Sequence, residues 1–385
     1  MTDMIPLAVP NLTGNEKKYL DHCIDTTFVS SVGEYVTMFE KMVAEATGSV
    51  DAVATSAGTT GIHAALTAAG VKQGELVIIP SFTFIASANA VRHCGADPWL
   101  MDISEDDWCL DPDLVRAEIE KNCEKKSDGK IYHRDTKQRI AALMPVYTLG
   151  NIPDMDQFRQ IADDYELPLI VDAACAIGAT FKGQNFGSLA DLSVLSFNGN
   201  KTITCGGGGA VVGCNKELLD HVRHLTTTAR VWPDYDFDEV GFNYRMTNIQ
   251  AAVGVAQMER MELFVKKKRV VRSFYEEKLD LLREKGISFF PATDGGGCWF
   301  SGIVLPEGSD LSQAKELCGK LKEYDIEARA FWKPVHLQTP YKNCPHSEME
   351  VSEKLWQRII VLPCSTNIVD VELEKVVQSL IGIMI

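Results

Sequence analysis

Short apolar runs alternate with segments of helical spacing through the first half of the chain. The apolar runs predict strands at Leu76–Pro80, Pro98–Ile103, Ile140–Val146, Leu169–Asp172, Leu192–Phe197 and Gly208–Gly213. One helix between them is predicted over Asp111–Lys121, with Asp111 as N-cap and Pro112 at the first helical position. This alternation predicts an α/β fold with a mostly parallel sheet covered by helices on both faces.

The pattern changes in the second half of the chain. The segment Thr247–Gln250 (TNIQ) has the form of a capping box and starts an apolar helix, which we expect to run into a longer basic helix at Val265–Leu282. We interpret that helix as the bridge from a large domain, residues 1–255, to a smaller α+β domain, residues 256–385.

Composition narrows the class of protein. The chain has 385 residues, 45% of them apolar, which is enough for two domains with real cores. Its net charge of −15 argues against nucleic-acid or anionic-membrane binding, because both need a basic face. The eleven cysteines form no CxxC pair, and the N-terminus lacks the features of a signal peptide. We therefore expect a cytoplasmic protein without a metal site.

The most informative segment is Val194–Gly213, VLSFNGNKTITCGGGGAVVG. A β-prone run ends in a small polar turn that carries Lys201, and the glycines Gly206 to Gly209 follow before a second apolar run. A lysine held in a dry pocket loses its proton more easily and can form a Schiff base with a carbonyl. Taken alone, the segment is equally compatible with a surface lysine beside a β-turn.

Two upstream segments favour the catalytic interpretation. Asp172 ends a short apolar strand (PLIVDAA), where a carboxylate could hold a protonated ring nitrogen, although a cap or turn is the plainer role. The segment Ala52–Leu66 (AVATSAGTTGIHAAL) is a small-residue turn opening a helix, and its free amides suit a phosphate, although a plain N-cap is the commoner case.

A phosphate-binding turn followed by an acid and then a lysine is an order that resembles the fold type I pyridoxal phosphate (PLP) enzymes. More narrowly, the chain resembles the DegT/DnrJ/EryC1/StrS family of sugar aminotransferases. The resemblance runs from about Ile5 to the C-terminus. It is carried by the segments NLTGNE, SAGTTGIHAAL, PSFTFIASANA, VDAA, SFNGNK, GGGGAVV, GFNYRMTNIQAA and PVHLQ. It implies a large PLP-binding domain, a smaller C-terminal domain and a homodimer with shared active sites.

The resemblance also implies roles for individual residues. Lys201 would bind the cofactor PLP covalently, release it when its amine form PMP is made, and move the proton, and Asp172 would hold the pyridine nitrogen. Phe84 would stack on the ring, and Asn243 would reach the phosphate from the neighbouring subunit. The phosphate ligands would be Gly58, Thr59, Thr60, Ser196 and, near it, Asn198.

Two positions depart from the family pattern. Cys175 stands where Gln, His or Glu usually touches the ring hydroxyl, and a thiol is a weaker hydrogen-bond partner. Tyr147 replaces the usual His of the V-H-x-x-G segment, and both sites face the cofactor or sugar in the family. Candidates for the nucleotide sugar or the glutamate carboxylate are Arg230, Arg329 and His336, with surface charge as the alternative for each.

By resemblance, the reaction moves an amino group from L-glutamate to C4 of a nucleotide-linked 4-keto-6-deoxy-N-acetylhexosamine. SFNGNK and the insert Lys125–Lys137 resemble the bacillosamine and legionaminic-acid members. The main rival substrate is a 4-keto-6-deoxymannose, as in perosamine formation. The nucleotide carrier stays open.

Three other function classes are disfavoured by particular residues. A sugar dehydratase of the same family would have histidine in place of Lys201. A dinucleotide-dependent oxidoreductase needs GxGxxG after the first strand, which SAGTTG does not supply. A non-catalytic binding protein has no need of both Lys201 and Asp172.

Overall fold

The structure is a computed structural model that describes residues 4–231 and 235–385. The first three residues of the N-terminal segment considered above lie outside it. None of the helices in the described part of the chain is long and apolar enough to cross a bilayer.

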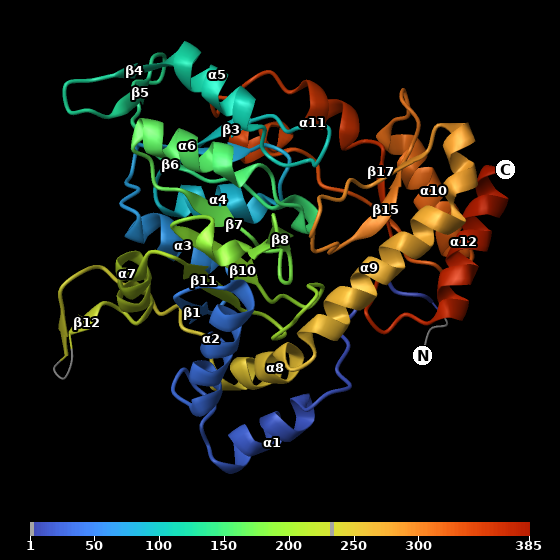
Figure 1. Cartoon of the computed structure of the whole chain (residues 1–385), viewed down its shortest axis with the longest axis horizontal. Helices are drawn as coiled ribbons and strands as arrows, with labels where there is room; N and C mark the ends of the chain where they lie inside the picture. Colours follow the sequence, from blue (N-terminus) through green and yellow to red (C-terminus); the bar gives the residue numbers. More distant parts are fainter. Residues whose placement is uncertain (1–3, 232–234) are drawn as a thin grey trace.

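A central sheet organises the first part of the molecule, with the strand order β3–β2–β6–β7–β10–β11–β1 (Figure 1). Isolated parallel bridges, Leu143 to Leu169 and Val146 to Asp172, join β6 to β7. Only β11 runs antiparallel to its neighbours, so the sheet is mostly parallel, as predicted. The strands are β1 (Asp51–Thr55), β2 (Leu76–Pro80), β3 (Asp97–Met101), β6 (Ile140–Leu143), β7 (Ile170–Asp172), β10 (Leu192–Ser196) and β11 (Gly209–Gly213).

The predicted strands are present at the expected positions, but several begin or end at other residues than predicted. The predicted strand from Ile140 stops at Leu143 instead of Val146. Pro145 accounts for this end, because proline has no N–H to donate to a ladder. The carboxyl ends of β7 and β10, at Asp172 and Ser196, lie at one edge of the sheet because these two strands are parallel.

Both faces of the sheet are buried, which explains the continuous apolar runs. On β2, Leu76 and Ile78 enter one hydrophobic cluster, and Val77 and Ile79 enter another on the opposite face. The first cluster includes residues of α2 (Glu34–Thr47), α5 (Pro112–Asn122), α6 (Met155–Tyr165) and α8 (Asn248–Met258), and the second those of α3 (Gly58–Ala68), α4 (Ile85–His93) and α7 (Lys216–Thr226). Helix α1 (Glu16–Asp25) packs beside α8.

Small hairpins and single 3₁₀ turns complete this part of the chain. They are β4 (Cys123–Lys125) with β5 (Ile131–His133), β8 (Thr180–Phe181) with β9 (Gln184–Asn185), β12 (Arg230–Val231) with β13 (Asp236–Phe237), and the turns η1 (Thr148–Gly150) and η2 (Phe186–Ser188).

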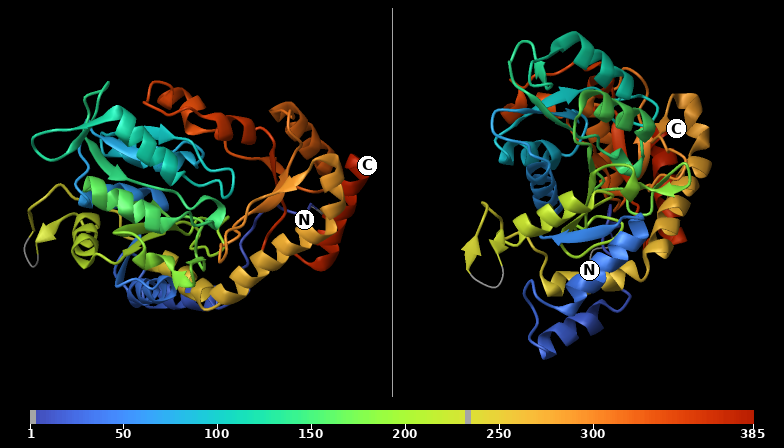
Figure 2. Two further views of the ribbon diagram at one scale, coloured as in Figure 1. Left: turned by 45° about the horizontal axis from the view of Figure 1, so that its top comes forward. Right: turned by 60° about the vertical axis from the view of Figure 1, so that its left-hand side comes forward.

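Helix α9 (Met261–Lys278) carries the chain from below the sheet to the C-terminal part (Figures 1 and 2). The capping box at Thr247 is confirmed, since its N–H donates to Gln250 Oε1 at 3.3 Å. We expected the helix after Thr247 to run directly into the next one, but the two are separated at residues 259–260. Helix α9 begins at Met261, earlier than the predicted Val265, and its residue Phe264 is buried in the core of the sheet. The predicted division at residue 255 falls inside α8 and stays a prediction.

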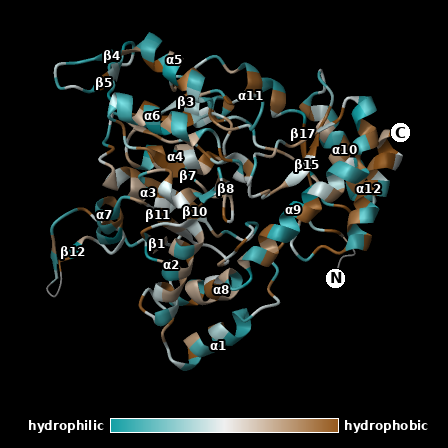
Figure 3. Cartoon of the chain, viewed as in Figure 1, coloured by the Kyte–Doolittle hydropathy of each residue, from teal (hydrophilic) through white to brown (hydrophobic). Residues whose placement is uncertain are grey.

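The C-terminal part has its own antiparallel sheet, in the order β14–β15–β17–β16. Its helices carry hydrophobic and hydrophilic residues along the same ribbon (Figure 3), as amphipathic helices do. The elements are η3 (Asp280–Lys285), β14 (Ser288–Phe289), β15 (Ser301–Val304), α10 (Leu311–Glu323), β16 (Arg329–Ala330), η4 (Val335–Leu337), η5 (Thr339–Tyr341), α11 (Glu350–Leu355), β17 (Ile359–Leu362) and α12 (Asp370–Met384).

The N-terminal segment joins this C-terminal core instead of the large domain expected from the sequence. Ile5 and Leu7 are buried in it, Ile5 bridges to Ile326, and the Leu7 N–H donates to Glu327 at 2.9 Å. Apolar side chains near a chain end reduce exposed area by joining whichever core lies within reach.

Candidate active site

Lys201 lies in the loop between β10 and β11. The loop is closed by backbone hydrogen bonds from Phe197 to Gly208 and from Cys205 to Phe197, both 2.9 Å, and Gly206 and Gly208 take the positive φ values that the turn requires. The half-buried Lys201 amine donates to Cys175 Sγ at 3.1 Å and lies 3.8 Å from the centre of the Trp299 ring.

Asp172 ends β7 and is buried. Its carboxylate accepts a 2.6 Å hydrogen bond from Ser87 Oγ and a 3.0 Å bond from the Ala174 N–H. Burial raises the pKa of Asp172, and these two hydrogen bonds and the charge of Lys201 act in the opposite direction. A cationic partner on this carboxylate would therefore offset a real cost of burial.

The predicted phosphate turn lies against the end of β10. A Cβ atom at Gly58 would meet Ser196 Cβ at 3.0 Å and Ser196 Oγ at 3.3 Å, so the start of α3 packs closely against Ser196 and only glycine fits there without strain. Thr60 Oγ1 accepts from the Ala57 N–H at 3.1 Å, so the Thr60 side chain satisfies the backbone N–H of the N-cap residue. The first-turn amides, including that of Thr59, have no acceptor within the helix and suit an anion.

Phe84 is the N-cap of α4, one turn before Ser87. Its ring is 54% exposed and lies 6.0 Å from the ring of Trp332. Because Ser87 binds Asp172, Phe84 is placed at the same sheet edge as that carboxylate. Asn198, in the lysine loop, is exposed as well.

The segment 241–247, which carries Asn243, is held between α7 and β1. Asn243 bridges to Thr227, and the carbonyl of Tyr244 accepts from the Ser56 N–H at 2.7 Å, next to the phosphate turn. The Asn243 side chain is exposed.

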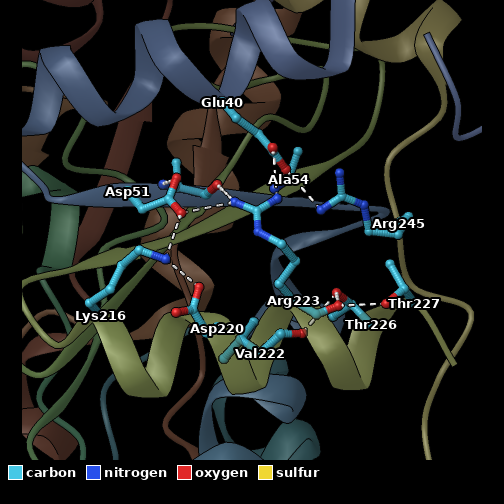
Figure 4. Close-up of polar contacts among 11 residues, drawn as sticks. Glu40, Asp51, Ala54, Lys216, Asp220, Val222, Arg223, Thr226, Thr227 and Arg245 are labelled. Atoms are coloured by element: carbon cyan, nitrogen blue, oxygen red, sulfur yellow. Dashed lines mark hydrogen bonds and ion pairs between the residues drawn. The ribbon is translucent and has the colours of Figure 1, made fainter. Parts of the chain in front are cut away.

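A partly buried charge network fixes this segment (Figure 4). Glu40, on α2, receives Arg223 on one carboxylate oxygen and Arg245 on the other, each at 2.9 Å. Arg223 also contacts Asp51 at 3.2 Å. One carboxylate thus ties together α2, α7 and the segment that carries Asn243.

The functional groups at this edge of the sheet are therefore an amine, a buried carboxylate, a helix N-terminus and an exposed aromatic ring. The family model described as the DegT/DnrJ/EryC1/StrS aminotransferase family matches residues 10–381. The chain belongs to this family.

Relatives of known name agree with this membership. A GDP-perosamine synthase of Caulobacter vibrioides is 35% identical over 393 residues, with 100% of each chain covered. A UDP-4-amino-4,6-dideoxy-N-acetyl-beta-L-altrosamine transaminase of Campylobacter jejuni is 34% identical over 340 residues, covering 86% of this chain and 85% of the relative.

The fold of the family is the fold of this chain. The sugar aminotransferase Spr1654 of Streptococcus pneumoniae, solved in a PLP form, superposes with a TM-score of 0.87 at 21% identity, covering 99% of this chain and 98% of that one. The DegT/DnrJ/EryC1/StrS aminotransferases depend on PLP. The close approach of the α3 N-terminus to Ser196 at Gly58 and the buried carboxylate of Asp172 fit the phosphate and the ring nitrogen of that cofactor.

The two departures from the family pattern have different surroundings. Cys175 faces Lys201, and burial raises the pKa of its thiol, partly countered by the lysine charge. Tyr147 is fully buried, packs edge-on against Phe186, and its hydroxyl has no hydrogen-bond partner among the described residues. The expectation that Tyr147 faces cofactor or sugar is corrected here, because its side chain points into the hydrophobic core.

The three residues considered as substrate ligands lie in separate elements. Arg230, in β12, lies 3.9 Å from the Tyr235 ring, and Arg329 is exposed in β16. His336 is buried, with Ser81 Oγ at 2.7 Å from one ring nitrogen and Glu353 at 3.0 Å from the other. Burial lowers the pKa of His336. Both of its ring nitrogens are therefore engaged within the chain, while a substrate role for the two arginines stays a prediction.

Two residues of the site were not predicted. Ser87 lies three positions after Phe84 in the same segment, and helical spacing from Phe84 could have found it. Trp299 carries no local signal, because it reaches Lys201 from the C-terminal part of the chain.

Proposed function

We propose that this chain transfers an amino group from L-glutamate to the C4 carbonyl carbon of a nucleotide-linked 4-keto-6-deoxyhexose. The observation that carries the proposal is the arrangement of Lys201, Asp172 and the close contact of Gly58 with Ser196 around one edge of the sheet. When bound, PLP supplies an electron sink that holds the amino group between donor and acceptor.

Each side chain then has a definite task. Asp172 keeps a proton on the pyridine nitrogen, which also offsets the cost of its own burial. The amides of Gly58 to Thr60, with Ser196 and Asn198, bind the phosphate, and Phe84 covers the ring. Lys201 Nζ holds the cofactor and carries the proton to and from the sugar carbon.

The absorbance of the cofactor-loaded protein tests this proposal. L-glutamate is expected to shift the PLP band to that of PMP, and a 4-keto sugar is expected to reverse the shift. The Lys201→Ala variant should show neither change at a comparable rate. If L-glutamate left the absorbance spectrum of the wild-type protein unchanged, the proposal would be contradicted.

Two acceptor sugars differ in the group at C2. The insert Lys125–Lys137, which favoured the acetamido sugar, forms the β4–β5 hairpin. Lys125 and Lys130 contact Glu166, just before β7 begins, so the hairpin lies at the edge of the sheet opposite to Asp172. The insert therefore gives no support to a choice of substrate.

The relatives covering nearly the whole chain include several GDP-perosamine synthases. We therefore propose GDP-4-keto-6-deoxymannose as the preferred acceptor. The UDP-linked acetamido sugar is the second candidate, because the Campylobacter transaminase and the SFNGNK segment favour it. The two sugars are compared by kcat/KM, and a higher value for the acetamido sugar would reverse the order.

A homodimer with shared active sites is part of the proposal. Exposed apolar side chains lie on three segments: the loop before α2, β13 with the residues after it, and the start of α8. They are Phe28, Val29, Val32, Phe237, Val240 and Ile249. The loop is tied to α8, since Asn248 donates to the Phe28 carbonyl at 2.7 Å. Exposed apolar side chains of this kind are available to a protein–protein interface, and sedimentation analysis would test the stoichiometry.

A further inference from the structure

The indole of Trp299 is fixed against the lysine loop by two contacts. Its Nε1–H donates to the Asn200 carbonyl at 2.8 Å, and its ring centre lies 3.8 Å from Lys201 Nζ. Trp299 is 3% exposed. A side chain from the C-terminal part thus packs directly on the residue that the reaction depends on.

The ring has little freedom to leave this position. The backbone N–H of Trp299 donates to the Leu149 carbonyl at 3.0 Å, and the Phe300 ring stacks on the indole with 3.8 Å between ring centres. Trp332 lies 6.0 Å away between ring centres and is tilted to the indole, so it does not stack on it. Moving the indole would therefore break contacts with both parts of the molecule.

The other groups near the amine do not neutralise its charge directly. Cys175 Sγ accepts from Lys201 at 3.1 Å, but burial raises the pKa of the thiol, so sulfur is a neutral partner at neutral pH. The carboxylate of Asp172 is already bound to Ser87 and to the Ala174 N–H. The negative face of the indole is thus a direct contact of the Lys201 amine, and the charge of Asp172 acts on the same amine.

We propose that Trp299 is a positioning residue that holds the free amine of Lys201 in place beside Cys175. The inference rests on the proposed function, in which Lys201 alternates between a covalent bond and a free amine. In the free state, the indole keeps Nζ at the position from which it exchanges protons with the sugar carbon.

Chemical labelling of the cofactor-free chain tests this inference. Lysines are acetylated at pH 7 with limiting acetic anhydride, and the rate at Lys201 is measured by mass spectrometry against the exposed Lys41. Trp299→Leu is expected to label Lys201 roughly fivefold to tenfold faster, the size of effect expected for loss of a partly desolvated cation–π contact. Trp299→Phe retains a ring face and should stay within about twofold of the wild type.

The neighbouring Trp332→Leu variant is the matched control and should leave the labelling rate unchanged. Circular dichroism confirms folding, and Trp299→Met, which fills more of the space, replaces the leucine variant if that one is unfolded. The inference would be overturned if a folded Trp299→Leu or Trp299→Met variant were acetylated at Lys201 at the wild-type rate. It would also be overturned if Trp332→Leu accelerated acetylation of Lys201 equally. Because neither cofactor nor glutamate is present, this result is independent of whether the proposed transamination occurs.

Discussion

The hydroxyl of Ser87 donates a 2.6 Å hydrogen bond to Oδ2 of Asp172. Both residues are buried, and the bond joins the start of α4 to the carboxyl end of β7. It stabilises the ionised carboxylate against the cost of burial, because a hydrogen bond to the charged form of an acid lowers its pKa.

Removing this hydrogen bond should change the pH dependence of catalysis. In Ser87→Ala, the pKa of Asp172 is expected to rise, so the acid limb of the kcat profile should move to higher pH and kcat at neutral pH should fall several-fold. Ser127→Ala, in an exposed turn, is the control. An unmoved acid limb would show that Ser87 does not tune Asp172.

Asp172→Asn should stabilise the cofactor-free chain and slow the reaction severely. Burial raises the folded pKa of Asp172 above its ordinary value of 3.8, so stability from this group is present below pH 3.8 and lost as pH rises through the folded pKa. Asparagine avoids that loss and can still accept from Ser87. The urea midpoint should therefore increase at pH 7 and change less at pH 4, and an equal change at both would refute the argument.

The same variant should retain some cofactor, since the phosphate contacts remain. Without the carboxylate the ring nitrogen loses its proton, and the ring becomes a poorer electron sink. An unchanged kcat would reduce Asp172 to a structural role.

Lys201→Ala should lower kcat by at least about a thousandfold, because covalent binding and proton transfer both use this amine. Its circular dichroism should match the wild type, since the loop is closed by backbone hydrogen bonds. Single-turnover transamination near the wild-type rate would remove Lys201 from the mechanism.

Gly58→Ala should weaken PLP binding roughly tenfold or more, because the new methyl group would fill the space beside Ser196 and crowd the first turn of α3. Equilibrium titration with PLP measures the effect. Gly319→Ala is the matched control, since a Cβ at that helical position meets no atom within 4 Å. Equal affinity in the two variants would place the phosphate elsewhere.

The shared active site can be tested with mixed dimers of Asn243→Ala and Lys201→Ala chains. If Asn243 acts in the partner's site, one site of the mixed dimer carries both lesions and the other carries neither. Activity should therefore return to roughly half of the wild type, in the manner of a symmetric interface. If subunit exchange is confirmed and activity does not recover, Asn243 acts in the active site of its own chain or lies outside both active sites.

Local pattern was sufficient to predict the sheet and the strand-end residues. Residues of β2 alternate between two hydrophobic clusters, and a parallel strand buried on both faces has a nearly continuous apolar sequence. Because parallel strands align their carboxyl ends, Asp172 and the lysine loop after Ser196 could be assigned to one edge from the sequence.

Contacts between distant segments could not be predicted in this way. Trp299 follows Asn200 by 99 positions, and the two meet only because the C-terminal part folds back on the lysine loop. Tyr147 occupies a position expected at the ligand, yet its side chain lies in the core against Phe186. Periodicity along the chain encodes which face of an element is buried, whereas the partner of a given side chain depends on how the elements pack in three dimensions.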